Sequence, residues 1–234
     1  SELRSLTVSR RYFSPDLFAF LRDLAVNNNR AWFNEHKARY EASVRQPALD
    51  FITDFVEPLE GLSPYFVADS RTVGGSLFRI HRDTRFAKDK TPYKLNTGMH
   101  FRHERAKDAH APGFYVHLQP RSCFIGVGLW MPEPRVAHQI RAHIDENQDE
   151  WIAATQNTAF ISMYELGGDS LKRPPRGFEA EHPLLTDMKR KSFIATGPIK
   201  HSDLRPPGRV GPAGRLFGEG YARSGLAPLW SLAA

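Results

Sequence analysis

Apolar side chains recur at helical spacing in the first part of the chain. Over residues 17–24 they fall at intervals of three and four positions, which predicts an amphipathic helix. This helix should begin at residues 14–16, because serine can cap a first turn and proline suits the first helical position. The asparagines at 27–29 should end it. A second apolar pattern predicts further helix from about Arg30, kinked or restarted at Pro47, where proline removes a backbone donor.

After residue 61 the pattern changes to short runs that are rich in β-branched and aromatic residues, and these predict strands. The predicted strands are 65–67, 76–82, 114–118, 123–130 and 191–195. Residues 119–122 make a connection of hairpin length, which favours antiparallel pairing. Helices are predicted from about residue 134, again over 183–188, and in a closing segment after the proline-rich and glycine-rich residues 201–214.

These elements predict the α+β class, with an antiparallel sheet flanked by N-terminal, central and C-terminal helices. We expect residues 1–234 to form one domain in three parts. They are a helical part over about 14–60, a sheet-rich centre over about 64–131, and a helical and loop-rich part over about 134–234.

Alternation along the predicted strands places polar side chains on one face of the sheet. In 76–82, Phe78 and Ile80 should share the core face, and in 114–118 the apolar residues should do the same. The other face would then hold Arg79, His81, Tyr115 and His117. On the neighbouring strand, Gly126 and Gly128 lie beside aromatic residues. They would either leave volume for a ligand or let a helix pack closely.

The charge of the 234-residue chain is uneven. Lys plus Arg number 32 and Asp plus Glu number 26, a net charge of +6. Residues 79–94 contain six cations and two anions, or net +4, whereas 133–150 contain five anions and two cations, or net −3. The hydrophobic content of 41% excludes a disordered chain, and the apolar runs are too short to span a bilayer. With no secretory pattern in this sequence, we expect a soluble, cytoplasmic protein.

The basic segment 79–94 is the strongest candidate site, because guanidinium and ammonium groups match phosphate and carboxylate oxygens. The expected ligand-binding residues are Arg79, Arg82, Arg85, Lys88, Lys90, Tyr93, Lys94, Tyr115, Lys172 and Arg173. His117 or His81 could transfer a proton, since histidine titrates near neutrality, and Asp83 could orient a histidine or an arginine. The partner would be an anionic small molecule, and whether the site is catalytic stays open.

Two other interpretations of the basic segment remain. It could contact nucleic acid or another protein, although anions lie between its cations and no nucleic-acid motif is present. It could also be an internal ion-pair network that only stabilises a long loop. We expect no cofactor and no metal, because His100, His103 and His110 match no metal-binding spacing. Cys123 alternates with apolar residues and is expected in the core rather than as a nucleophile.

Motifs along nearly the whole chain resemble those of a bacterial and fungal family known as domain of unknown function 2461. They are Asn27-Asn28 through Trp32-Phe33 with Lys37 and Tyr40, Arg79-Ile80, Arg82 to Phe86, Lys88 to Lys94, Tyr115 and His117 with Gln119-Pro120, Leu171 to Pro175, His182-Pro183, and Lys191 to Phe193. The resemblance implies a mixed α and β fold but no established activity. Ala87 departs from the serine expected of the family, so a ligand contact through that hydroxyl would be lost here.

Overall fold

The computed structural model describes residues 12–105 and 112–200. Side-chain caps begin its first two helices. The Ser14 hydroxyl accepts the backbone N–H of Asp16 at the start of α1 (Pro15–Val26), and the Asn29 side chain accepts the N–H of Trp32 at the start of α2 (Arg30–Glu35). Both helices begin where the sequence predicts.

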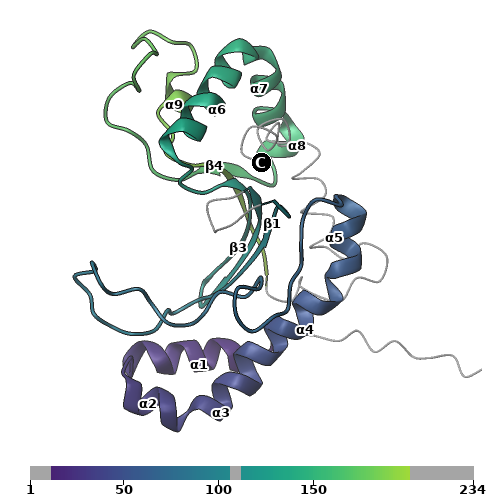
Figure 1. The fold of residues 1–234 in the computed structure, drawn as a ribbon, viewed down its shortest axis with the longest axis vertical. Coiled ribbons are helices and arrows are strands. Elements are labelled where there is room, and N and C mark those ends of the chain that lie inside the picture. Colours follow the sequence, from purple (N-terminus) through teal and green to yellow (C-terminus); the bar gives the residue numbers. More distant parts are fainter. Residues whose placement is uncertain (1–11, 106–111, 201–234) are drawn as a thin grey trace, which may run out of the picture.

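The chain then continues through α3 (Lys37–Tyr40), a π-helical turn η1 (Glu41–Arg45), α4 (Gln46–Asp54) and α5 (Val56–Leu62), which together form a long helical arm (Figure 1). In η1 the N–H of Gln46 donates to the carbonyl of Glu41, a wider step than in an α-helix. Pro47 lies in the first turn of α4, where its missing N–H is not needed. The interruption predicted at Pro47 is therefore this wider turn.

Five antiparallel strands form one sheet in the order β1-β2-β3-β5-β4. Their bounds are β1 (Thr97–Arg102), β2 (Gly113–Gln119), β3 (Ser122–Leu129), β4 (Glu165–Gly167) and β5 (Phe193–Pro198). The β2–β3 hairpin pairs Gln119 with Ser122, as its short connection predicts. The α+β class and the antiparallel sheet are thus confirmed.

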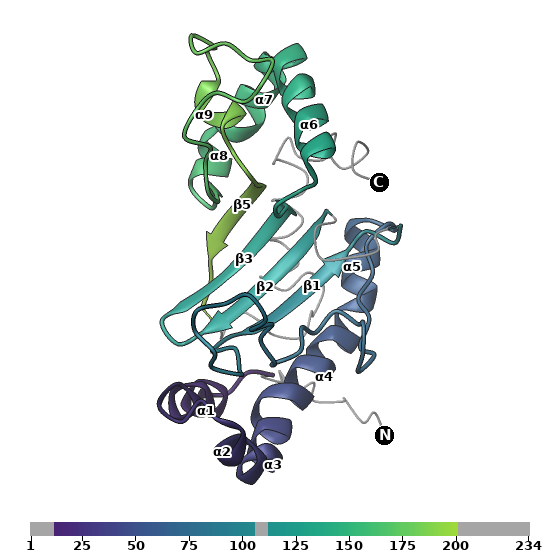
Figure 2. The same cartoon turned by 60° about the vertical axis from the view of Figure 1, so that its left-hand side comes forward.

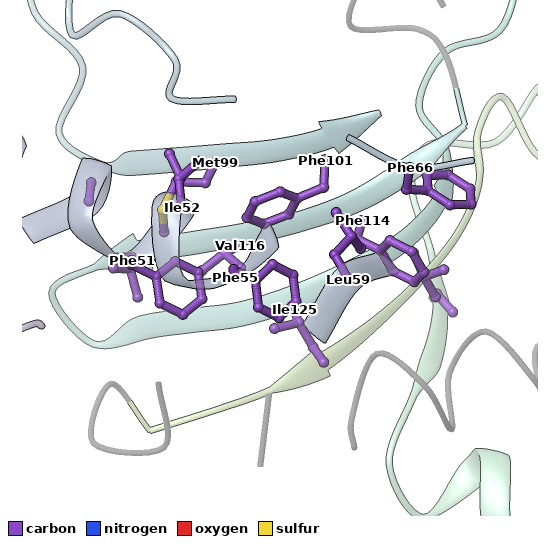
Figure 3. Packing of buried hydrophobic residues seen from close by; sticks show 14 of the residues in the cluster. Phe51, Ile52, Phe55, Leu59, Phe66, Met99, Phe101, Phe114, Val116 and Ile125 are labelled. Atoms are coloured by element: carbon purple, nitrogen blue, oxygen red, sulfur yellow. The ribbon is translucent and has the colours of Figure 1, made fainter. Parts of the chain in front are cut away.

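The main core lies between one face of the sheet and helices α4 and α5. Figure 3 shows Phe51 of α4 and Phe55, at the junction of α4 and α5, packed against Phe101 and Phe114 from the strands. The ring centres of Phe55 and Phe101 are 4.9 Å apart. Burial of these large aromatic side chains supplies much of the driving force that fixes the arm on the sheet.

Helices α6 (Pro134–Glu146), α7 (Gln148–Thr155), α8 (Thr158–Ile161) and α9 (Leu185–Met188) gather at the other end of the sheet (Figure 2). Buried polar groups connect them. The indole N–H of Trp151 donates to Asp187 at 2.9 Å, and Arg141 Nε donates to the Met188 carbonyl at 2.6 Å. Among the described residues, no helix is both long enough and apolar enough to cross a membrane.

Two predicted strands are not formed. Residues 65–67 and 76–82 make only isolated bridges, which are Phe66–His103, Leu77–Met99 and His81–Tyr93. The sequence did not predict β1 or β4. The predicted closing helix after residue 214 lies outside the described residues.

Candidate functional site

Strand alternation divides β2 as predicted. Phe114, Val116 and Leu118 are fully buried on the core face, and Tyr115 and His117 lie half-buried on the opposite face. Pairing with β1 places Gly98 beside His117, and pairing with β3 places Phe124 there. The rings of His117 and Phe124 are stacked, with centres 4.5 Å apart.

A polar network runs along this second face through Asn96, Tyr115, His117 and Gln119. The Tyr115 hydroxyl lies 3.0 Å from His117 Nδ1, and the Gln119 side-chain oxygen lies 3.1 Å from His117 Nε2. An amide oxygen can only accept, so Nε2 carries the proton and Nδ1 accepts from the tyrosine hydroxyl. Asn96 Nδ2 also lies 3.4 Å from Nδ1. Both ring nitrogens of His117 are therefore occupied.

Burial keeps both titratable members of the network neutral. Desolvation lowers the pKa of His117 from 6.5, although the hydrogen bond to Gln119 acts in the other direction. Burial also raises the pKa of Tyr115 to about 12. At neutral pH the face thus presents an imidazole and a phenol, which carry no charge.

Gly98 makes the space that this network needs, whereas Gly126 and Gly128 do not. A Cβ atom at Gly98 would lie 2.5 Å from the Tyr115 hydroxyl, so any other residue there would displace the tyrosine ring. At Gly126 the nearest atom to an added Cβ is the Tyr115 Cβ at 3.7 Å, an ordinary contact. Gly128 has a φ of +128° and its added Cβ would collide with the Phe193 carbonyl, so this glycine serves close pairing with β5 rather than a ligand cavity or helix packing.

Anions within the basic segment neutralise part of its charge. Arg82 pairs with Asp89 and also contacts Thr91. Arg85 pairs with Asp83 at 2.6 Å. The hydrogen bond from the Arg85 side chain holds the pKa of Asp83 at about 2. The backbone N–H of Thr91 and, after it, the side chain of Arg82 hold the pKa of Asp89 at about 2. This part of the segment therefore behaves as the internal ion-pair network that the sequence left as an alternative.

The remaining cations are Arg79, Lys88, Lys90 and Lys94, and none of them makes an ion pair with a described residue. Lys94 is half-buried, and its ammonium donates to the Arg79 carbonyl at 3.0 Å. The ammonium also lies 5.3 Å from the centre of the Phe78 ring. Burial lowers the pKa of Lys94, and the nearby charge of Arg79 lowers it further. Arg79 itself is exposed, and its charge lies near enough to act on that of Lys94.

Phe78 joins Lys94 to the polar network. Its ring centre is 6.0 Å from that of Tyr115 and 6.0 Å from that of His100. The prediction that Phe78 faces the core is wrong, because Leu77 bridges to Met99 on the core face and Phe78 therefore points to the other face.

The other predicted site residues lie elsewhere. His81 is exposed, and its ring contacts are Phe33 and Tyr93. Tyr93 is buried, stacks on Phe33 at 4.2 Å, and its backbone is held by Asn28. Asp83 contacts Arg85 rather than a histidine.

Lys172 and Arg173 are exposed in the loop between β4 and α9, at the opposite end of the sheet from 79–94 (Figures 1 and 2). The structure therefore does not bring these two cations together with those of the basic segment.

Asn96, Gln119 and Phe78 are members of the site that the sequence reasoning missed. Gln119 could have been found, because it continues the alternation of Tyr115 and His117 along one strand. Asn96 precedes β1, which the sequence did not predict, so no sequence pattern indicated that Asn96 would join the network.

A hollow of about 1450 Å³ lies beside α1 and the ends of β3 and β5, where it is bordered by Phe124 and Cys123. Cys123 is half-buried, its thiol donates to the Gln119 carbonyl at 3.4 Å, and burial raises its pKa. A protonated thiol is a poor nucleophile. The described residues contain no cluster of three or more His, Cys, Asp or Glu that could hold a metal ion.

The comparisons with known proteins give a family but no activity. A search of curated proteins finds no match to this chain. A family model described as a conserved hypothetical protein matches residues 16–210, which include the helical arm, the whole sheet and every residue of the polar network. The chain therefore belongs to the DUF2461 family of conserved hypothetical proteins.

Proposed function

We propose that the sheet face around Tyr115 and His117 binds an anionic small molecule, with Lys94 and Arg79 as its charge contacts. The observation that carries this proposal is the half-buried ammonium of Lys94 beside a second cation, without a carboxylate partner among the described residues. A desolvated charge next to a like charge is unfavourable. A bound anion would offset both the cost of burying the Lys94 charge and its repulsion with the charge of Arg79.

The polar network suits a binding role. Tyr115 and His117 are neutral, so they neither cancel the charge of Lys94 nor repel an anion. Because both nitrogens of His117 already have partners, proton transfer to a ligand would require one of those hydrogen bonds to break. The geometry therefore favours binding over catalysis, and the catalytic roles of His117, His81 and Asp83 stay predictions.

The chemistry of the contacts limits the ligand class. An ammonium group and a guanidinium group recognise phosphate or carboxylate oxygens. Phe78 and Phe124 border the same face and offer half-buried aromatic surface. A compact phosphate-bearing or carboxylate-bearing molecule with an apolar or planar part fits this combination.

The contacts within residues 82–91 of the basic segment favour a second role for that part of it. Pairing of Arg82 with Asp89 and of Arg85 with Asp83 supports a bracing function there. Of the ten residues that the sequence assigns to ligand binding, we therefore retain Lys94, Arg79 and Tyr115 for this ligand.

The test is thermal unfolding in the presence of inorganic phosphate, pyrophosphate or citrate at constant ionic strength. Ligand at about 100 times its dissociation constant should stabilise the native state by about 2.7 kcal/mol. Lys94→Gln should abolish the increase in Tm. Arg85→Gln is the matched control, because that cation is already neutralised by Asp83, and it should keep the increase.

Two results would refute the proposal. One is an equal increase in Tm for wild type and Lys94→Gln, and the other is no increase with any anion of the two classes.

A further inference from the structure

Phe86 has the most exposed large apolar side chain among the described residues. It is 95% exposed, and its ring contacts only the guanidinium of its neighbour Arg85 in the described structure, at 5.9 Å. Scattered exposed apolar residues are normal in proteins. Phe86 differs because cations flank it in a loop, residues 82–91, that we name the basic finger (Figure 1).

The basic finger is held in shape without help from Phe86. Arg82 pairs with Asp89 across the base of the loop. Lys90 Nζ donates to the Thr84 carbonyl at 2.8 Å, which connects the two sides nearer the tip. An aromatic side chain presented on an ordered loop loses little conformational entropy on binding, which is the property of an interface anchor.

The charge of the basic finger favours an acidic partner. Its cations are Arg82, Arg85, Lys88 and Lys90 and its anions are Asp83 and Asp89, so its net charge is +2. Lys88 is exposed, and Lys90 donates only to carbonyl groups, so both charges remain uncompensated by described carboxylates.

The chain itself carries a hollow whose lining is acidic. A hollow of about 290 Å³, which we name the acidic hollow, is lined by Asp145, Gly177, Phe178, Glu179, Glu181, His182 and Pro183. Glu179 and Glu181 are exposed and make no ion pair with a described residue. Phe178 is half-buried and offers an aromatic wall.

Side-chain hydrogen bonds hold the loop around the acidic hollow in place, as they do in the basic finger. The His182 ring lies 2.8 Å from Asp145 through Nε2, and its Nδ1 accepts the backbone N–H of Leu184 at 3.0 Å. These bonds fix the loop against the end of α6. An apolar ring could enter without a large rearrangement of the wall.

The basic finger and the acidic hollow cannot meet within one chain. The finger lies toward the end of the molecule that holds α1 to α3, whereas the hollow lies beside α6 and α9 at the other end (Figures 1 and 2). A twofold axis between two antiparallel copies would place each finger at the partner's hollow, which gives the same contact twice.

We propose that the partner of the basic finger is a second copy of this chain, and that Phe86 enters the acidic hollow of that copy while Lys88 and Lys90 approach Glu179 and Glu181. One aromatic side chain buries about 150–250 Å². Two such contacts fall short of the roughly 1,200–2,000 Å² of a stable interface, so this dimer is weak and sensitive to salt.

The test is sedimentation equilibrium of the full chain over a wide concentration range, at ~0.05 M and ~0.5 M NaCl. The weight-average mass should rise with concentration toward that of a dimer at low salt and much less at high salt. Phe86→Ser should leave a monomer. Val73→Ser is the matched control, because Val73 is a similarly exposed apolar loop residue outside both surfaces, and it should associate like wild type.

Charge exchange tests the pairing itself. Lys88→Glu alone and Glu181→Lys alone should each weaken association, and the double variant should recover it because the two charges have exchanged places. Glu150→Lys on α7 controls for a change of net charge and should not restore association to Lys88→Glu.

The proposal is overturned if wild type stays monomeric, if Phe86→Ser associates like wild type, or if the double variant does not recover association. All of these positions are exposed, and circular dichroism of each variant shows whether it is folded. The proposal does not depend on the ligand site at Tyr115, whose Tm assay is read separately.

Discussion

Replacement of Gly98 by alanine tests the link between the sheet backbone and the polar network. The added Cβ would lie 2.5 Å from the Tyr115 hydroxyl and 3.0 Å and 3.1 Å from two ring carbons. Because the phenol ring is rigid, the ring itself must move. The displacement would break the 3.0 Å hydrogen bond between the hydroxyl and His117 Nδ1.

The size of the effect follows from three contributions. Overpacking of a close contact costs about 1–3 kcal/mol, and loss of the hydrogen bond adds about 1 kcal/mol. Against these, replacing a strand glycine by alanine contributes about 0.5–1 kcal/mol of stability. We therefore expect Gly98→Ala to lower the free energy of unfolding by about 1–3 kcal/mol.

Urea denaturation measures this change, and Gly126→Ala is the matched control. Gly126 lies opposite Tyr115 on β3, and its added Cβ meets atoms at 3.7–3.9 Å. Gly126→Ala should leave the free energy of unfolding unchanged or raise it by up to about 1 kcal/mol. If Gly98→Ala is as stable as Gly126→Ala, the space beneath the tyrosine hydroxyl is not what the glycine provides.

Three further substitutions or conditions have definite expectations. Asn28→Ala should lower the free energy of unfolding in urea by about 2 kcal/mol, because it removes two hydrogen bonds of 3.0 Å to the backbone of buried Tyr93. An unchanged midpoint would contradict a stabilising role for these two bonds. Arg85→Gln should leave the urea midpoint unchanged, because its pair with Asp83 is exposed, and a clear loss of stability would mean that the pair supports the fold. Since the folded pKa of His117 lies below its unfolded value of 6.5, the unfolded chain binds more protons between these two values. The stability contributed by neutral His117 should be complete above about pH 6.5 and be lost as the pH falls toward the folded pKa. The pH dependence of unfolding should therefore be shallower in His117→Gln, and identical profiles would exclude this contribution.

Alternation in β2 is the part of the site that the sequence predicts well. Phe114, Val116 and Leu118 are buried and Tyr115 and His117 face the other way, because a side-chain period of two holds throughout a paired strand. The same reasoning fails at Phe78. That segment only bridges to β1, and a shift of one position exchanges the two faces.

Strand β1, which the sequence did not predict, shows why only part of the polar network could be predicted. Its sequence mixes Gly98 and His100 with Met99 and Phe101, and all four are buried. The polar members of β1 are buried because neighbouring rings and glycines fit around them, which no local pattern reveals. The internal pairing of Arg82 with Asp89 likewise depends on the fold of the loop rather than on its composition.

The most direct test of the proposed ligand site is an NMR titration of isotope-labelled protein with inorganic pyrophosphate at constant ionic strength. We predict saturable shifts of the His117 ring and Tyr115 resonances, and we predict that Lys94→Gln removes them while Arg85→Gln does not. Resonances of His117 and Tyr115 that stay unchanged, or shifts that are confined to the basic finger, would contradict an anion site on this face of the sheet.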